Sequence, residues 1–174
     1  MKKIFTIIFA CLATMTAMAQ SDGSTVANAW GLNGNGTETD PYRISTAADL
    51  KAMAENCNAE HKGTGEYFKM TSDIDFGGSA DSPVQLPAIG KDGNAQIANI
   101  AYGFDGTFDG DGHTISGIYH TNNTNNADGK YNALFGCIDK NGVVKNIVFS
   151  ENNHITGYNY VSSIASLNMG IIEN

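Results

Sequence analysis

Basic side chains, cysteine, proline and long apolar runs are all scarce in this chain. Its 174 residues include 10 Lys and Arg against 18 Asp and Glu, with only 3 cysteines and 3 prolines. Nucleic acids and anionic membranes bind proteins through basic surface, so this acidic chain is not expected to bind either. Outside the first twenty residues, no apolar run reaches the length of a transmembrane helix. These absences exclude nucleic-acid binding and membrane insertion from the predicted functions.

Recognisable catalytic motifs are absent as well. The chain has no Gly-x-Ser-x-Gly nucleophile elbow, and its glycine-rich segment 31–36 lacks the Lys-Ser/Thr ending of a phosphate-binding loop. Its four histidines are dispersed along the chain, which disfavours zinc chemistry. Arg43 is its single arginine and its lysines are scattered, so the cationic cleft of a polysaccharide lyase is not expected. The sequence predicts no catalytic residue and no resident cofactor.

The first nineteen residues have the pattern of a secretory signal peptide. A basic start at residues 2–3 precedes the apolar run 4–12, and Ala17-Met18-Ala19 supplies a small-x-small cleavage site. Cys11 leaves a lipoprotein as the alternative, although cleavage before it would split the apolar run. Removal of the signal peptide leaves 8 basic and 18 acidic residues, a net charge of −10. We therefore expect an exported protein, at the cell surface or in the extracellular space.

Two cysteines remain after that cleavage, Cys57 and Cys137. An exported protein can pair them in a disulfide. However, Cys57 falls on the apolar stripe of a predicted helix and Cys137 inside a predicted strand repeat, where cysteine acts as a small apolar residue. Two buried thiols are the preferred interpretation, and the disulfide stays open as the alternative.

Three stretches of the chain repeat one pattern of apolar residue, polar residue, turn former and apolar residue. They are Ile115–Ile118, Val144–Ile147 and Ile172–Asn174, which begin 29 and then 28 residues apart. A unit that recurs at this period is typical of a β-solenoid, whose repeats bury their inward faces only against neighbouring repeats. An elongated contact surface is therefore expected rather than a deep catalytic pocket.

The same alignment makes a prediction about one corner of the repeat. Asn146 and Asn174 stand where Gly117 stands in the first copy. Glycine and asparagine both tolerate a left-handed backbone, so we expect these three residues to occupy equivalent corners. Asparagines at stacked corners can also hydrogen-bond from one repeat to the next.

The repeat region carries a family resemblance. Residues 104–118, 134–136 and 142–147 read FDGTFDGDGHTISGI, LFG and GVVKNI, and they resemble bacterial surface proteins with GLUG repeats. Upstream, residues 36–50 (GTETDPYRISTAADL) and 68–75 (FKMTSDID) are similar to the usual lead-in of these proteins. The resemblance covers residues 30–174. It implies an all-β, right-handed parallel β-helix and an adhesin-like protein at the cell surface or secreted from the cell.

The last copy departs from the family pattern. In residues 161–174, serines stand where the family has glycines, so this copy is degenerate. The chain stops at Asn174 within the repeat pattern, without a closing helix or a sorting tail. An open end of this kind exposes apolar residues and a strand edge. We therefore expect a fragment of a longer protein, with docking of the open end onto a partner as the alternative.

The pattern divides the chain into a signal peptide (1–19), an irregular lead-in (20–36), an N-terminal cap (37–66) and the β-helix repeats (67–174). Trp30 is the expected apolar anchor of the lead-in. The cap contains a strand at 42–44 and a helix at 46–57, which begins with a capping box of Thr46 and Asp49. One face of that helix carries Leu50, Met53, Ala54 and Cys57. We expect the helix to cover the apolar end of the first repeat.

Strand-sized segments alternate with turns rich in Gly, Asn and Asp in residues 67–174. Two polar insertions, 77–100 and 121–129, are expected to form loops that stand off the solenoid. The expected inward residues are Phe104, Phe108, Ile115, Ile118, Leu134, Phe135, Ile138, Val144, Ile147, Phe149, Ile155, Val161, Ile164, Leu167 and Ile172.

The densest group of functional side chains is Asp105, Asp109, Asp111 and His113. Three carboxylates within seven residues are compatible with a calcium site, although the spacing is not that of an EF-hand. Aspartates beside glycines are more often residues that cap turns with their own side chains. Turn architecture is therefore the preferred interpretation, with calcium as the weaker one.

The sequence leaves three functional hypotheses. The first is an adhesin-like module that binds an extracellular glycan, or a protein of a host or neighbouring cell, along one face of the solenoid. Its stacking platforms would come from Tyr102, Tyr119, Tyr131, Tyr158 and Tyr160. The second is a carbohydrate-active enzyme whose acid and base come from aspartates of adjacent repeats, drawn from Asp73, Asp75, Asp105, Asp109, Asp111 and Asp139. The third is a passive stalk for a further domain.

Overall fold

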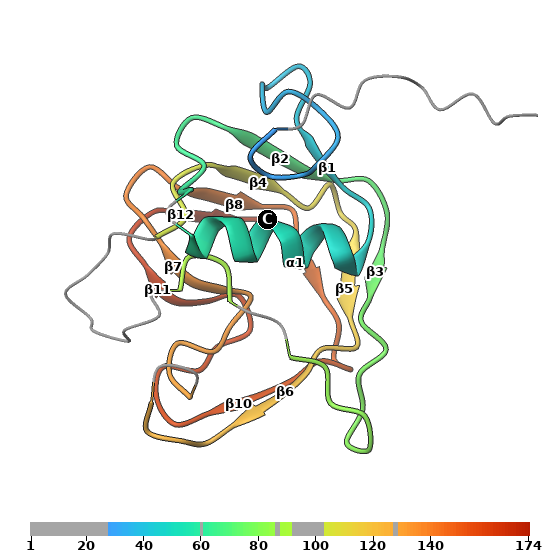
Figure 1. The fold of residues 1–174 in the computed structure, drawn as a ribbon, viewed down its shortest axis with the longest axis vertical. Coiled ribbons are helices and arrows are strands. Elements are labelled where there is room, and N and C mark those ends of the chain that lie inside the picture. The colour runs from blue at the N-terminus through green and yellow to red at the C-terminus, as the bar shows by residue number, and fades with distance from the viewer. Residues whose placement is uncertain (1–27, 60, 86–87, 92–102, 127–128) are drawn as a thin grey trace, which may run out of the picture.

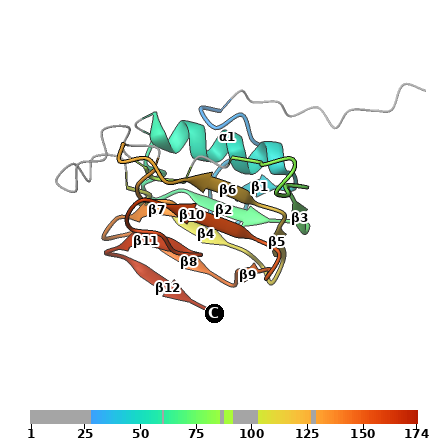
Figure 2. The same cartoon turned by 90° about the horizontal axis from the view of Figure 1, so that it is seen from below.

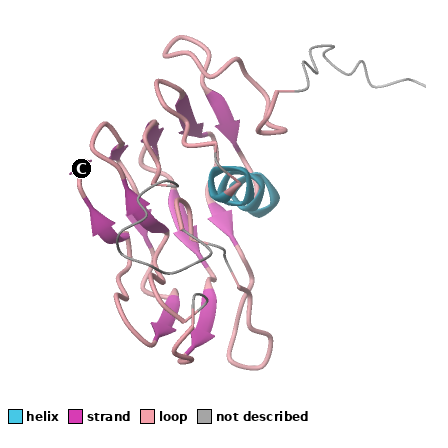
Figure 3. Ribbon diagram, turned by 60° about the vertical axis from the view of Figure 1, so that its left-hand side comes forward, coloured by secondary structure: helices cyan, strands magenta, loops and turns pink. Residues whose placement is uncertain are grey.

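The computed structural model describes residues 28–59, 61–85, 88–91, 103–126 and 129–174 (Figure 1). The predicted signal peptide, Cys11 and the first part of the lead-in lie outside these residues. The described part is mostly β-strand with one helix (Figure 3). Its elements are β1 (Tyr42–Ile44), α1 (Ala47–Asn58), β2 (Tyr67–Met70), β3 (Ile74–Asp75), β4 (Thr107–Asp109), β5 (Thr114–Ser116), β6 (Tyr119–Asn122), β7 (Phe135–Ile138), β8 (Val143–Lys145), β9 (Val148–Phe149), β10 (His154–Gly157), β11 (Ala165–Asn168) and β12 (Ile171–Glu173).

These strands form four sheets, in which each strand runs parallel to its neighbours. One sheet has the order β1-β2-β4-β8-β12, a second has β3-β5-β9, and two further pairs are β6-β10 and β7-β11. From β4 onward the chain visits the four sheets in the same order twice, and it then returns to the first sheet at β12. We call one such passage through the sheets a circuit. Successive circuits lie on top of one another, so the all-β class and the stacking of repeats are as expected.

The register of the first sheet shows how the circuits align. Tyr42, Phe68, Phe108, Val144 and Ile172 lie side by side on the five strands. The spacing between these residues is uneven, because the circuits contain insertions of different lengths. Val144 and Ile172 are equivalent, as the repeat pattern predicted.

The first copy of the predicted repeat was aligned wrongly. Ile115 pairs with Phe149 in the second sheet, and it is Phe108 that pairs with Val144. Gly117 consequently lies at the corner after β5, one sheet later than the corner of Asn146. Both residues have the left-handed backbone that was expected, with φ of 68° and 54°. The error arose because two corners of one circuit carry the same apolar, polar, turn-forming pattern.

Helix α1 closes one end of the stack. Figure 2 shows the helix above β1, with β2, β4, β8 and β12 following in order away from it. The predicted capping box is present, because the Thr46 hydroxyl accepts from the Asp49 N–H at 3.1 Å and the Asp49 carboxylate accepts from the Thr46 N–H at 2.9 Å. The four apolar residues that were expected on its inner face are buried: Leu50, Met53, Ala54 and Cys57.

The lead-in is anchored more firmly than the sequence predicted. Trp30 is only 1% exposed, and its indole N–H donates to the Glu66 carboxylate at 2.8 Å. Its ring meets Phe68 edge-on, with the ring centres 4.8 Å apart. Leu32 is buried as well, so the indole is not the sole apolar anchor of the lead-in. These contacts tie the segment before β1 to the first circuits.

An aromatic column runs through the interior of the stack. The rings of Phe68, Phe104, Phe135 and Phe108 follow one another with centres 5.4 to 5.7 Å apart. Each of these side chains is at most 1% exposed. Tilted and edge-on ring contacts of this type stabilise a core beyond the burial of their area. The column joins circuits that are distant in sequence.

The insertion 77–100 was expected to stand off the stack, but its described residues pack against it. Ile89 is fully buried, and its backbone bonds to Leu134 and Gly136 place it beside β7. Val84 forms an antiparallel bridge to Tyr119. The segment therefore contributes to a circuit. The prolines at positions 83 and 87 had indicated a loop, although Ala88 is buried beside Ile89. In the other insertion, residues 121–122 belong to β6, and residues 123–126 are exposed.

The last circuit is far less buried than its predecessors. Val161 and Ile172, which were expected to face inward, are 41% and 44% exposed. In the described residues β12 has a strand on one side only, so the side chains of this circuit lack the layer that would cover them.

Neither Cys57 nor Cys137 is in a disulfide, as the preferred interpretation expected, but only Cys57 is fully buried, and Cys137 is half-buried. Burial raises the pKa of the Cys57 thiol to about 12 and that of Cys137 to about 11. Both side chains are therefore protonated thiols that pack, rather than reactive thiolates.

Candidate functional site

The predicted aspartate group is spread over the corners of several circuits. Asp105 is buried, and its carboxylate accepts from the Thr64 hydroxyl at 2.9 Å and from the backbone N–H of Asn141 at 3.1 Å. The Asn141 side-chain amide donates to it as well, at 3.1 and 3.2 Å. Burial raises the pKa of this carboxyl, but these hydrogen bonds outweigh burial and hold the pKa below its usual value. Asp105 is thus a structural residue that ties three segments together.

Asp109 has the same role at the corner after β4. Its carboxylate accepts from the Asn146 side-chain amide and from the Asp111 N–H, both at 2.9 Å, and it lies 3.6 Å from the Lys145 ammonium. Burial raises the pKa of Asp109, yet these partners lower it overall. Asp111 pairs with Lys69 at 3.0 Å. The Asn146 contact joins the corner after β8 to the corner after β4. Its acceptor is an aspartate, and the side-chain amide of Asn174 donates to the Ile147 carbonyl at 3.2 Å, so neither bond is the predicted one between stacked asparagines.

Asp73 and Asp139 each contact a residue of a neighbouring segment. Asp73 accepts from the Thr114 N–H at 2.9 Å and lies 3.1 Å from His113 Nδ1. The Thr114 and His113 contacts lower its pKa. Asp139 pairs with the Lys62 ammonium at 3.2 Å. Asp75 accepts from the Gly77 N–H at 2.9 Å.

These geometries bear on the enzyme and calcium hypotheses. The general acid of a glycosidase needs a carboxyl group with a raised pKa. The pKa values of Asp73, Asp105 and Asp109 are instead all lowered. The described residues contain no group of three or more His, Cys, Asp or Glu side chains arranged to hold a metal ion. The carboxylates of Asp105 and Asp109 accept hydrogen bonds from residues at the corners around them, so they stabilise turns.

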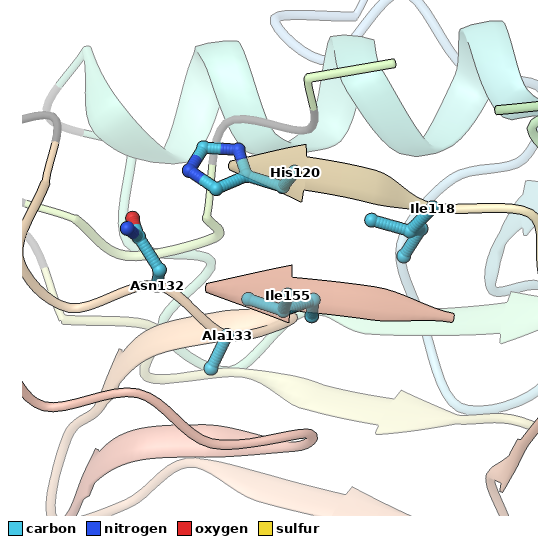
Figure 4. Close-up of a pocket in the computed structure, with 5 residues that line it drawn as sticks. All are labelled: Ile118, His120, Asn132, Ala133 and Ile155. Carbon is cyan, nitrogen blue, oxygen red and sulfur yellow. The ribbon is translucent and has the colours of Figure 1, made fainter. Parts of the chain in front are cut away.

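A small cavity lies under the strand pair β6-β10. It is lined by Ile118, His120, Asn132, Ala133 and Ile155, and Figure 4 shows the imidazole and the amide on one side of it and Ile118 on the other. Its volume of about 10 Å³ has room for roughly one water molecule. Small-molecule sites are usually of several hundred Å³. This cavity is therefore part of the packing and not a substrate pocket.

Two stacked ring pairs mark the outer side of the β6-β10 region. Tyr119 and His154 occupy the same register position on β6 and β10, and their rings are 4.5 Å apart and 19° from parallel. Tyr131 and Tyr160 lie 4.8 Å apart and only 7° from parallel. Tyr158 and Tyr160 are each 48% exposed. Of the predicted platform tyrosines, Tyr119 begins β6, Tyr131, Tyr158 and Tyr160 follow the far ends of β6 and β10, and Tyr102 lies outside the described residues.

His154 is the residue of this site that the sequence did not reveal. Its partner Tyr119 lies in the previous circuit, 35 positions earlier. The uneven length of the circuits hides that pairing. The 29-residue distance between Tyr131 and Tyr160 was visible, because it matches the predicted repeat.

Both tyrosines of the second ring pair have an unusual backbone. Tyr131 has φ of 55° and Tyr160 has φ of 57°. Bulky residues seldom adopt this left-handed conformation, which costs of order 1–3 kcal/mol and recurs at functional sites. The parallel bridge between Lys130 and Asn159 fixes the two positions relative to each other.

The end of the stack away from α1 has an apolar depression of about 170 Å³. It is lined by Val144, Lys145, Ile147, Ile164, Ile172, Glu173 and Asn174. The depression is the uncovered interior of the last circuit. Its shape gives no indication of what covers it.

Comparisons with known proteins find two long relatives. A Gly-rich membrane protein of Evansella cellulosilytica is 32% identical over 171 residues, which cover 97% of this chain and 17% of the relative. Halomucin of Haloquadratum walsbyi is 33% identical over 144 residues, which cover 81% of this chain and 1% of that protein. The chain therefore spans a small part of the relatives that it matches. No family model matches the chain, and no solved structure matches it significantly.

Proposed function

We propose that this chain is a binding module exposed at the cell surface or outside the cell, built as a right-handed parallel β-helix of the kind found in proteins with GLUG repeats. The parallel register and the repeated order of the four sheets support the β-helix. Parallel strands of one sheet are joined by right-handed crossovers in almost all proteins, which supports the hand.

The names of the two relatives support the location. One is named as a membrane protein and the other as halomucin, and each matches most of this chain. In the described residues, no helix has the length and apolar character needed to cross a bilayer. We propose that the chain acts outside the membrane and contacts its partner through the flank of the stack.

The observation that carries the binding function is the pair of aromatic stacks on the β6-β10 flank. They combine half-exposed rings with left-handed backbone at Tyr131 and Tyr160. The aspartates favour binding over catalysis. Asp105 and Asp109 have lowered pKa values, and their carboxylates accept hydrogen bonds at the corners between strands.

Two measurements test this proposal. Export of the tagged chain from a bacterial host, followed by protease treatment of intact cells and assay of the medium, should find it outside the cytoplasm. Retention of an unprocessed chain in the cytoplasm would contradict the location. Adhesion of the purified chain to panels of polysaccharides and extracellular proteins should find at least one partner, and that binding should weaken in a Tyr158→Ala/Tyr160→Ala variant.

A passive stalk is the second candidate. It is favoured by the length of the relatives, of which the matched region is a small part. The same adhesion experiment separates the two, because a stalk binds no member of either panel with or without the tyrosines. Hydrolysis of a polysaccharide that is abolished by Asp105→Asn and Asp109→Asn would instead support the enzyme.

A further inference from the structure

Two segments of the flank around β6 and β10 contain no charged residue, although the chain is strongly acidic and Lys130 lies beside one of them, bridged to Asn159. Residues 119–126 and 152–162 contain no Lys, Arg, Asp or Glu, in a chain with 18 acidic residues and a net charge of −8. We call these two segments the uncharged strip. They lie together because β6 and β10 pair in parallel over their full length, from Tyr119–His154 to Asn122–Gly157. An uncharged surface in so acidic a chain limits the chemistry of what can bind there.

Exposed rings provide the apolar part of this surface. Tyr158 and Tyr160 are half exposed, and the His154 side chain is exposed beside Tyr119. Tyr131 covers one face of the Tyr160 ring, and Tyr160 is nevertheless 48% exposed. The stacking of one ring pair does not exceed the cost of holding two tyrosines in a left-handed backbone. The ring pair is therefore not explained by stability alone.

The strip also carries exposed hydrogen-bonding groups without charge. The exposed residues of the strip include Thr121, Asn123, Asn125, Asn152 and Asn159. Amides and hydroxyls both donate and accept, so they match the hydroxyl groups that rim a sugar ring. The C–H face of a sugar matches the face of a tyrosine. Neutral glycans present mainly these two kinds of group.

Other ligand classes fit the strip less well. Carboxylated or sulfated glycans are recognised by clusters of Arg and Lys. The strip itself contains neither residue, Lys130 is a single lysine beside it, and the net negative charge of the chain repels anionic polymers. Protein interfaces are enriched in Tyr, Trp, Phe, Met and Arg, and of these the strip contains tyrosine alone.

We propose that the uncharged strip binds a neutral polysaccharide, with the exposed rings of Tyr160 and Tyr158 against sugar rings and the neighbouring Asn side chains on sugar hydroxyls. This inference rests on the proposed binding function and names its ligand class.

Affinity electrophoresis in native gels tests it. Gels would contain galactomannan, starch or xyloglucan as neutral probes, and polygalacturonate or heparin as anionic probes. The chain should be retarded by at least one neutral polymer and by neither anionic one. Tyr160→Ala and Tyr158→Ala should each weaken binding about five- to tenfold, the loss expected for one aromatic contact.

Controls separate binding from folding. Tyr67, half-buried on β2 outside the strip, gives the matched variant Tyr67→Ala, which should bind as the parent does. Tyr160→Phe keeps the ring and should restore binding to within about twofold, because stacking does not need the hydroxyl. Tyr158 has no unusual backbone angle, so its variant remains informative if Tyr160→Ala fails to fold.

The outcomes are distinct. Retardation by the anionic polymers alone, or neutral binding that both alanine variants leave unchanged, would overturn the neutral-glycan inference. Binding to proteins only would overturn it too, while leaving the proposed binding module intact. No binding to any polysaccharide or extracellular protein would overturn both.

Discussion

The two ends of the stack differ sharply in what covers them. At the α1 end, Met53 and Leu50 are fully buried, and Trp30 is 1% exposed. At the β12 end, Ile172 is 44% exposed, although it lies in register with the buried Val144 of β8 and Phe108 of β4. The same kind of side chain at the same kind of position is therefore buried only where a further layer lies over it. In such a fold, burial is a property of neighbouring circuits and not of a residue alone.

The largest effect should come from a matched pair of substitutions at the two ends. Met53→Ala removes a fully buried side chain under the helix, so we expect a loss of about 2–5 kcal/mol in the free energy of unfolding. Ile172→Ala removes a half-exposed side chain and should cost less than about 1 kcal/mol. Urea unfolding monitored by circular dichroism measures both. Equal losses would contradict the comparison.

Gly117→Ala tests a corner between the ends, with a second glycine as its control. Gly117 has φ of 68°, and an added Cβ would collide with the Asp75 carboxylate and the Gly77 N–H. Gly31 has φ of 66°, and nothing lies within 4 Å of the Cβ that alanine would add. Gly31→Ala should cost about 1–2 kcal/mol from the backbone alone, and Gly117→Ala should cost clearly more. A smaller loss at Gly117 would show that the corner can rearrange.

Thr46→Ala weakens the helix that closes the covered end. The variant loses the hydroxyl that accepts from the Asp49 N–H, and an N-cap substitution of this type costs about 1 kcal/mol. Thermal unfolding of Thr46→Ala and Thr46→Ser should show the loss in the first and near-parent stability in the second. A loss of equal size in Thr46→Ser would point to packing and not to capping.

Acid should weaken the stack through its corner aspartates, with a smaller effect for each residue. Asp105 and Asp109 have lowered pKa values in the folded chain, so their contribution is full above the unfolded pKa of about 3.9. It is lost as the pH falls through the folded pKa. The free energy of unfolding should therefore drop below about pH 4, and Asp105→Asn should make that drop shallower. A pH dependence that Asp105→Asn leaves unchanged would assign the effect to other carboxylates.

Much of the fold was predictable because its signals are local. The helix followed from the capping box of Thr46 and Asp49 and from the apolar spacing after it. Strands β1 and β2 followed from alternating residues between turns. What failed were the relations between circuits. The equivalence of Phe108 and Val144 was hidden by uneven insertions, and the place of Ile89 in the stack depends on contacts with β7 that no local pattern records.

The candidate site was predictable in part for the same reason. Tyr131 and Tyr160 share the repeat spacing and do stack, whereas the pairing of Tyr119 with His154 depends on the register of β6 and β10. The aspartates were conspicuous in the sequence, and their expected role at turns is confirmed by the hydrogen bonds of Asp105 and Asp109. The aspartates are frequent in the sequence because each circuit needs corners, and aspartate side chains stabilise those corners.

Amide hydrogen exchange, read strand by strand, tests the central claim most directly. If burial depends on layers at both sides, protection should be high in β2 and β4, which have strands on either side, and should fall through β8 to β12. Met53→Ala should lower protection first in β1 and β2. Protection in β12 equal to that in β4 would contradict the account, because it would mean that the last circuit is stable without a layer over it.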